Sequence, residues 1–244
     1  MWTGLTAGRI DLCRSYGLGD LEPAFRERNS NLLKERRGAG YWLWKPYVVR
    51  DALEWAADGD AIVYCDSGSI FIGDVGPIVR MCRDETPGIL GFTMSKFEEQ
   101  CWTKRDAFLL MDCDEPRFHQ SPQIDNSLCV FIKNDFSRAL VDQWLHYAQD
   151  PRILTGMPNR CGQDNLPGFQ DHRHVQSIFS LLNKKHDLWG ASHGLIHGRI
   201  VSTVRVDVQT PLDWVRPLAR SKRMVRWLRP VSLARWRRPQ SITD

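Results

Sequence analysis

Apolar residues along the chain follow two spacings, one typical of helices and one typical of buried strands. Helical spacing predicts helices from Pro23, from Pro46, over 75–84, over 103–111, over 135–149 and from about His172. Short, continuous β-rich runs predict strands over 61–65, 88–93 and 127–133. Because strands alternate with helices, the pattern predicts one α/β domain with a Rossmann-like, mostly parallel central sheet flanked by helices.

The alternation ends near residue 210, and a basic segment follows. Nine of the 33 Lys and Arg residues lie between Arg216 and Arg238 with no acidic residue among them, and Trp residues are interleaved. We therefore expect a domain over 1–210 and a basic tail over 211–244. Arg and Trp side chains together suit an anionic membrane surface, which residues 214–238 would bind. Single-stranded nucleic acid, a less favoured partner, and bulk solvent are the alternatives.

Composition and motifs weaken several other classes of protein. The seven cysteines are scattered singly, without a CxxC pair, which is typical of reduced thiols in the cytosol. No apolar run is long enough to span a membrane, and the first residues lack the order of a signal peptide. No GxSxG, Walker A, HExxH or GxGxxG sequence is present. We expect a cytoplasmic protein, held on the inner face of a membrane if the tail binds lipid.

The first candidate site residue follows the strand predicted over 61–65. Asp66 lies where that strand emerges, and Ser67 and Gly68 let a ligand approach the backbone. With Tyr64 beside it, this carboxylate suits a diphosphate bridged by Mg²⁺ or Mn²⁺, because these ions prefer oxygen ligands. The alternative is an Asp that caps the following turn.

A Gly-flanked loop between the first two predicted helices concentrates aromatic side chains. Its residues include Tyr41, Trp42, Trp44 and Lys45. Exposed rings in a turn suit stacking on a base or sugar while the Lys45 ammonium meets a phosphate. Packing in the core is the alternative for each Trp.

Two further polar groups flank predicted elements. Lys104 and Arg105 begin a helix and are candidates for neutralising the charge of a departing diphosphate. Gln123, Asp125 and Asn126 precede the next predicted strand and present groups suited to sugar hydroxyls. The alternative for Lys104 and Arg105 is that they only begin the helix, and the alternative for Asp125 and Asn126 is that they only form a turn.

The densest polar cluster lies at the start of an apolar-striped helix, where free backbone N–H groups favour anionic or hydroxyl-rich ligands. Its members are Asp171, His172, Arg173, His174, Gln176 and Ser177. The two imidazoles suit a metal ligand or a general base, and capping or surface roles are the alternative. His193 and His197 form a weaker second group.

Taken in order, five segments resemble a bacterial glycosyltransferase-like family of the nucleotide-diphospho-sugar transferase (GT-A) superfamily. The segments are GAGYWLWKP (38–46), GDAIVYCDSG (59–68), WTKRDAF (102–108), IDNSLCVFIKN (124–134) and HRHVQSIFSLL (172–182). The resemblance, over about residues 10–200, implies a nucleotide-sugar donor and a glycan or lipid-linked glycan acceptor, as in capsule or lipopolysaccharide biosynthesis. It also implies Mn²⁺ or Mg²⁺ at the aspartate motif.

Together with the candidates above, the resemblance gives each residue an expected role. The expected catalytic residues are Asp66, His174 and Gln176, with Asp66 also the metal ligand. The expected donor-binding residues are Trp44, Lys45, Tyr64, Asp66, Ser67, Gly68, Lys104 and Arg105. The expected acceptor-binding residues are Gln123, Asp125, Asn126 and His172.

The sequence departs from the family pattern in three places. Asp66 is followed by Ser67 and Gly68 rather than by a second Asp, and Val175 stands where an Asp is expected beside Gln176. The strand expected to open such a domain is not evident. These departures support the alternative of a catalytically impaired or truncated relative that binds sugar nucleotides or glycans.

Overall fold

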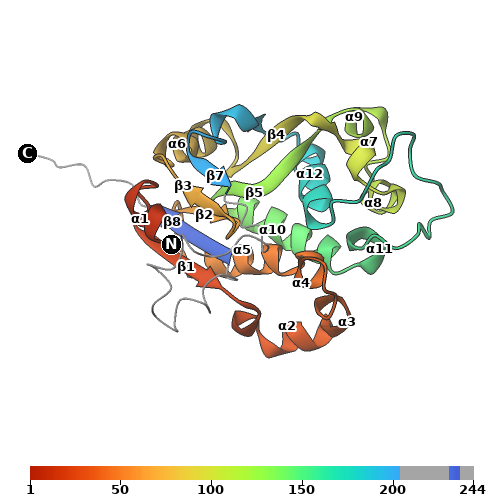
Figure 1. Ribbon diagram of the computed structural model, residues 1–244, viewed down its shortest axis with the longest axis horizontal. Coiled ribbons are helices and arrows are strands. Elements are labelled where there is room, and N and C mark those ends of the chain that lie inside the picture. The colour runs from red at the N-terminus through yellow and green to blue at the C-terminus, as the bar shows by residue number, and fades with distance from the viewer. Residues whose placement is uncertain (204–230, 237–244) are drawn as a thin grey trace, which may run out of the picture.

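A six-stranded sheet runs through the part of the chain that the computed structural model describes, residues 1–203 and 231–236 (Figure 1). The strand order is β1-β8-β2-β5-β4-β6. The strands are β1 Leu12–Tyr16, β2 Ala61–Cys65, β4 Ile89–Glu98, β5 Pro122–Ile132, β6 Ala191–Ser192 and β8 Val231–Trp236. Every residue of β2 is buried, as its continuous apolar run predicts.

The sheet is mixed, and the prediction of mostly parallel strands is wrong. Strand β5 lies between β2 and β4 and runs antiparallel to both. The reason is the connection after β4: Glu98 pairs with Pro122, so the helices between them return the chain to the same end of the sheet. A parallel pair would need a connection that crosses to the opposite end. Among the described strands, only β4 and β6 pair in parallel.

Helices cover both faces of the sheet (Figure 1). Helices α5 (Trp44–Trp55), α10 (Asp135–Ala148) and α12 (Val175–Lys185) pack on one face, in a core that includes Tyr64 of β2. Helix α6 (Gly76–Glu85) packs on the other face, in a core that includes Val63. Neighbouring residues of β2 therefore point to opposite cores, as the pleat of a strand requires.

Five of the predicted helices are confirmed with shifts in their ends, but the helix predicted from Pro23 to Gly38 is divided at Asn29 into α2 and α3 and ends at Leu33. Helix α2 begins at Pro23 and α6 has a proline in its first turn, where the missing N–H leaves no hydrogen bond unmade. The shorter helices are α1 Trp2–Thr6, α2 Pro23–Arg28, α3 Ser30–Leu33, α4 Gly38–Tyr41, α7 Glu99–Trp102, α8 Arg105–Leu110, α9 Pro116–His119 and α11 Pro151–Leu154. Two 3₁₀ turns, Leu18–Asp20 and His193–Leu195, and a small sheet of β3 Ser69–Phe71 and β7 Val201–Thr203 complete the described elements. No described helix is long and apolar enough to cross a membrane.

Two strands at one side of the sheet were not predicted. Strand β8 falls within the expected basic tail, yet its backbone pairs with both β1 and β2. The rest of the expected tail, including most of the expected membrane-binding segment 214–238, lies outside the described residues.

Candidate functional site

An irregularity in β5 places polar side chains beside the end of β2. Leu90 pairs with Val130 but Phe92 pairs with Asp125, so β5 contains extra residues between these pairs. Bulged strands of this kind redirect side chains and are frequent beside functional sites. The Asp66 N–H group donates to the Ser127 carbonyl oxygen at 2.8 Å, which fixes the end of β2 against the bulge.

The residues expected to precede a strand therefore lie inside one. Gln123, Asp125 and Asn126 belong to the first half of β5, which begins at Pro122 rather than near residue 127. The polar run resembled a turn, but it pairs with β4 and is mostly buried. Because β5 is antiparallel to β2, this first half lies next to the carboxyl end of β2.

Four side chains form the centre of the site. The Lys45 ammonium lies 2.9 Å from Asp66 Oδ1 and donates to Asn126 Oδ1 at 3.2 Å. The Tyr64 hydroxyl donates to Asp66 Oδ1 at 2.6 Å. Burial raises the pKa of Tyr64 well above its usual value, and the Asp66 charge raises it further, so the phenol stays protonated. Lys45 is nearly buried, whereas Asp66 remains partly exposed to a ligand.

A cavity of about 300 Å³ opens in front of this cluster. We call it the Asp66 cavity, and its lining residues are Arg37, Trp42, Lys45, Asp66, Trp102, Asn126, Asp171, Arg173, His174, Val175 and Gln176. The structure thus brings together the aromatic loop, the end of β2, the bulge of β5 and the polar cluster before α12. Its cations, aromatic rings and hydrogen-bonding groups suit a ligand that carries both negative charge and hydroxyl groups.

Two of the residues that line this cavity each have a buried polar atom without a hydrogen-bond partner. These atoms are Asn126 Nδ2 and His174 Nε2, and the two residues are only 2% and 1% exposed. Within the described residues, the one other buried side-chain atom without a partner is Arg105 Nε. Buried polar atoms without a partner are uncommon and costly. A ligand that accepts from Asn126 and donates to His174 would satisfy both.

The hydrogen-bonding state of His174 follows from its surroundings. Its Nδ1 lies 2.8 Å from the Leu154 carbonyl oxygen, so Nδ1 carries the proton and Nε2 is an acceptor. Burial and, to a smaller extent, the nearby Arg37 charge lower the pKa of His174 to about 4, so the ring is neutral near pH 7. The backbone angle φ is 54° at His174 and 61° at Trp42, and both values lie in the region that non-glycine residues rarely adopt. Such residues cluster at functional sites.

The amide of Gln176 is oriented by a buried network. Gln176 Nε2 donates to Gln123 Oε1 at 2.8 Å, and Gln123 Nε2 donates to Glu99 Oε1 at 3.0 Å. Since the Glu99 carboxylate only accepts, it fixes both amides, and Gln176 Oε1 remains as an acceptor for the cavity. Glu99 in turn pairs with Lys184 at 2.5 Å, and both side chains are fully buried.

Sequence reasoning missed Glu99 and Lys184. A signal was present on α12, where Ser177, Ser180 and Lys184 recur at spacings of three and four residues along one helix face. All three side chains are buried, and the Ser180 hydroxyl and the Lys184 ammonium both contact Glu99. A polar stripe of this kind within an apolar helix indicates a buried network.

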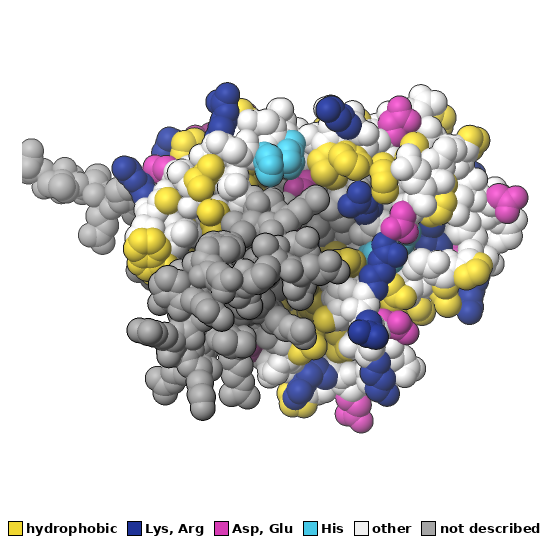
Figure 2. Space-filling model, in the orientation of Figure 1, with side chains coloured by type: hydrophobic (Ala, Val, Ile, Leu, Met, Phe, Trp, Pro, Cys, Tyr) yellow, Lys and Arg dark blue, Asp and Glu magenta, His cyan; other side chains and the backbone are white. Residues whose placement is uncertain are grey.

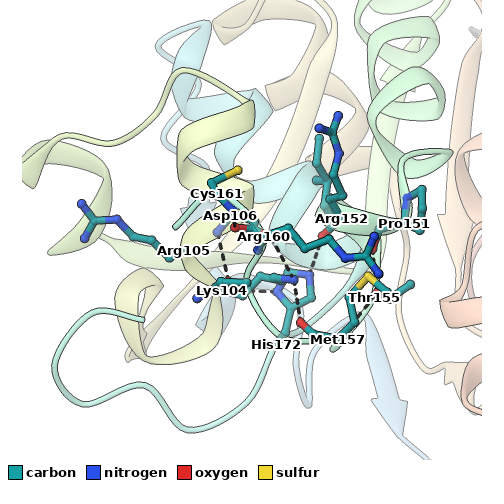
Figure 3. Close-up of polar contacts among 12 residues, drawn as sticks. Lys104, Arg105, Asp106, Pro151, Arg152, Thr155, Met157, Arg160, Cys161 and His172 are labelled. Atoms are coloured by element: carbon teal, nitrogen blue, oxygen red, sulfur yellow. Dashed lines mark hydrogen bonds and ion pairs between the residues drawn. The ribbon is translucent and has the colours of Figure 1, made fainter. Parts of the chain in front are cut away.

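Lys104, Arg105 and His172 are among the expected site residues that do not line the Asp66 cavity, and Lys104 and His172 contact the segment 151–161 instead (Figure 3). Lys104 Nζ donates to the Met157 carbonyl oxygen at 2.7 Å and lies 3.5 Å from Asp106 Oδ2. His172 donates from Nε2 to the Ile153 carbonyl oxygen and accepts the Lys104 N–H at Nδ1, so both ring nitrogens are used. Arg105 pairs with Asp114 at 2.7 Å. Their contacts stabilise the fold around the site.

Three other donor candidates, Trp44, Ser67 and Gly68, do not line the Asp66 cavity. Trp44 Nε1 donates to the Gly38 carbonyl oxygen at 3.0 Å, and its ring packs against the core, whereas Trp42 lines the cavity. Ser67 and Gly68 form an exposed turn directly after Asp66 and do not line it.

Asp125 faces away from the Asp66 cavity. Its Oδ2 lies 3.5 Å from His193 Nε2 and accepts the Ser127 hydroxyl, while Oδ1 accepts the Ser127 N–H at 3.0 Å. Burial alone would raise the pKa of Asp125, but the hydrogen bonds from His193 and Ser127 outweigh it and lower the pKa. The bond to Asp125 raises the pKa of His193.

The donor set around Asp66 does not fit a divalent metal site. Mg²⁺ and Mn²⁺ take several oxygen ligands, but here one carboxylate oxygen already receives Lys45 and Tyr64. In the described ranges, no group of three or more His, Cys, Asp or Glu side chains is placed to hold a metal ion. The Lys45 ammonium supplies positive charge at this position instead.

Comparison with protein-family models, with curated proteins and with solved structures found no match. The functional conclusion therefore depends on the geometry and chemistry of the site.

Proposed function

We propose that this protein is a glycosyltransferase that moves a sugar from a nucleotide-sugar donor to a glycan acceptor. The observation that carries the proposal is the pair of buried atoms without partners, Asn126 Nδ2 and His174 Nε2, beside the Lys45–Asp66 ion pair. Unpaired polar atoms of opposite hydrogen-bonding character, next to a paired charge, favour a polar ligand over an apolar one.

The cations around the Asp66 cavity suit the diphosphate of the donor. Lys45, Arg37 and Arg173 all line it, and the Arg173 guanidinium lies 4.4 Å from the centre of the Trp102 ring, which restricts its position. A restricted guanidinium loses little conformational freedom when it binds phosphate oxygens. The hydroxyl groups of the donor sugar can then donate hydrogen bonds to Asp66, His174 Nε2 and Gln176 Oε1.

In the proposed reaction an acceptor hydroxyl oxygen forms a bond to the anomeric carbon of the donor sugar. The bond from that carbon to the diphosphate oxygen breaks with its electron pair, and the hydroxyl proton leaves to the departing diphosphate or to water. Lys45 and the two arginines stabilise the charge that develops on the diphosphate, and the cavity orients the two reactants. No step is assigned to Mn²⁺ or Mg²⁺, because the donor set does not fit them.

A second candidate is a relative that binds the donor without transferring the sugar. Val175 favours it: this side chain is buried in the core and lines the cavity where the resemblance expects a carboxylate. The remaining proposals are a cytoplasmic location, a lipid-linked acceptor in surface polysaccharide biosynthesis, and contact of residues 214–238 with an anionic membrane.

The test is the melting temperature of the full chain with UDP-, GDP-, CMP- and dTDP-sugars, with and without Mn²⁺ or Mg²⁺. A donor that binds only the folded state raises it. We expect one donor class to do so without metal, and Asp66→Asn to abolish the rise. Asp58→Asn is the matched control, since this side chain is 91% exposed and has only a long contact to Lys133.

Sugar transfer or donor hydrolysis by the same preparation separates the two candidates. Stabilisation with turnover supports the transferase, and stabilisation without turnover supports the binding relative. A donor panel that leaves the melting temperature unchanged would contradict both.

A further inference from the structure

A second and larger cavity, of about 660 Å³, lies beside the proposed donor site. It opens between the second half of β4 and the segment 189–194, and we call it the Trp189 cavity. Its hydrophobic wall includes Met94, Phe97, Pro122 and Trp189. None of these residues was assigned a function from the sequence.

The two cavities share a wall. Phe97 lines the Trp189 cavity, and the centre of its ring lies 5.4 Å from that of Trp102, which lines the Asp66 cavity. A second connection runs through β5. Asp125 contacts His193, which lines the Trp189 cavity, and the adjacent Asn126 lines the Asp66 cavity. Ligands in the two cavities would therefore lie on opposite sides of the same few residues.

Polar side chains also line the Trp189 cavity, among them Lys96, Ser192 and His193, and His193 Nε2 faces Asp125. The carboxylate holds the imidazole in place and leaves Nδ1 for a ligand. The His197 ring stacks on the His193 ring, with ring centres 5.5 Å apart. On the face shown in Figure 2, histidine side chains lie close to hydrophobic side chains and to a row of Lys and Arg side chains.

The backbone of the loop that carries Trp189 is held against β4. The Trp189 carbonyl oxygen accepts a hydrogen bond from the Thr93 hydroxyl at 2.6 Å. Gly190 has a φ of 76°, and a Cβ atom on Gly190 would lie only 2.8 Å from the Thr93 hydroxyl oxygen. The indole nevertheless remains 42% exposed. A large exposed ring on an ordered loop is typical of a binding surface.

We propose that the Trp189 cavity binds a pyranose ring of the acceptor glycan, which stacks on Trp189 and shares a hydrogen bond between one of its hydroxyls and His193. A pyranose ring has an apolar face of C–H groups and an edge of hydroxyls, and this cavity offers an aromatic wall with an oriented imidazole beside it. The role as acceptor rests on the proposed function, because it requires a donor in the adjacent Asp66 cavity. Binding of a sugar in the Trp189 cavity does not itself depend on the proposed function.

The test uses the full chain labelled with 5-fluorotryptophan and observed by ¹⁹F NMR. The Trp189 resonance is the one missing from Trp189→Phe, and the Trp2 resonance is an internal control because that side chain is 77% exposed on α1. Methyl glycosides of glucose, galactose, mannose, rhamnose and N-acetylglucosamine are titrated to about 100 mM, which detects millimolar dissociation constants.

We expect at least one glycoside to shift the Trp189 resonance in a saturable way and to leave that of Trp2 unchanged. His193→Ala should weaken this binding on the order of tenfold. Asp58→Asn should leave it unchanged, because that side chain is exposed and lines neither cavity. Trp189→Phe, which keeps an aromatic ring, should bind better than Trp189→Ala when binding is followed by saturation-transfer NMR of the glycoside.

Three outcomes would overturn the inference. The first is no shift of the Trp189 resonance by any glycoside, and the second is equal binding by Trp189→Ala and the wild type. The third is a shift by hexanol but by no glycoside, which would indicate an apolar ligand. Glycoside binding with no response to any nucleotide-sugar would keep the cavity as a sugar site but overturn its role as an acceptor site.

Discussion

The Lys45 ammonium reaches from α5 to the end of β2 and lies 2.9 Å from Asp66 Oδ1. This contact joins the aromatic loop that precedes α5 to the carboxylate at the centre of the candidate site. Lys45 is buried, so its charge depends on Asp66 and on the oxygen atoms of Asn126 for compensation.

We predict that Lys45→Met destabilises the protein and abolishes donor binding. Removing one partner of a buried ion pair costs about 3–5 kcal/mol, and the partial exposure of Asp66 reduces this to about 1–3 kcal/mol. Urea unfolding measures the change. Arg117→Met is the control, because its contacts with Glu115 and Asp187 are exposed. A Lys45→Met protein that still binds the donor would contradict the assignment of Lys45 to the diphosphate.

Asn126→Asp tests the amide atom that lacks a partner. The aspartate keeps an oxygen for Lys45 but replaces the Nδ2 donor by a second acceptor beside Asp66. We expect the chain to fold and the affinity for an anionic donor to fall about 10–100-fold, since a hydrogen bond to a charged group contributes about 1.5–3 kcal/mol. Isothermal titration with the stabilising donor checks this. Unchanged affinity would mean that Asn126 Nδ2 does not contact the ligand.

The buried pair of Glu99 and Lys184 predicts strong coupling between two substitutions. Glu99→Gln and Lys184→Met should each destabilise the fold by about 3–5 kcal/mol, because each leaves a buried charge without its partner. The double variant should be less destabilised than the sum of the two single variants. Guanidinium unfolding of the four proteins in this cycle measures the coupling. Additive effects would show that the two charges do not depend on each other.

The neutral state of His174 predicts a pH dependence of stability. Its pKa is about 4 in the folded protein, against an ordinary value of 6.5. As the pH falls from 6.5 towards 4, the unfolded chain gains a proton that the folded protein does not, so stability is lost by up to about 1.4 kcal/mol per pH unit. His172, with a pKa of about 3, acts in the same direction.

His174→Asn should reduce this slope, because its amide can replace Nδ1 as a donor to Leu154 but does not titrate. Urea unfolding between pH 7 and pH 5 provides the measurement, and ¹⁵N NMR of the imidazole reports its protonation directly. An imidazole of His174 that titrates near pH 6.5 in the folded protein would contradict the prediction.

Much of the fold could be predicted from the sequence. Prolines at helix starts and the apolar stripe of α10 located the helices, and the run Ala61–Cys65 located β2 and so the position of Asp66. These signals are local, because they depend on the spacing of residues within one element.

Strand direction could not be predicted, because the sequence of β5 does not specify its partner. Its apolar half suits either a parallel or an antiparallel neighbour, and its polar half, Gln123–Asn126, resembles a turn. Strand β1 lacks an apolar run, and β8 lies in a sequence dominated by arginine. The buried charges of Glu99 and Lys184 were missed because charged residues are rarely buried unless they are paired, and the partner is 85 residues away.

The pairing of Glu98 with Pro122 also bears on how this protein can change during evolution. The chain leaves and re-enters the sheet at one pair of facing residues, so the segment between them is a large insertion at the end of a hairpin. Its exposed turn at Asp112 lies far along the chain from both anchors, and residues added there would not alter the alignment of β4 with β5. Related chains can therefore differ in length at this turn while they keep the arrangement of Asp66, Asn126 and His174.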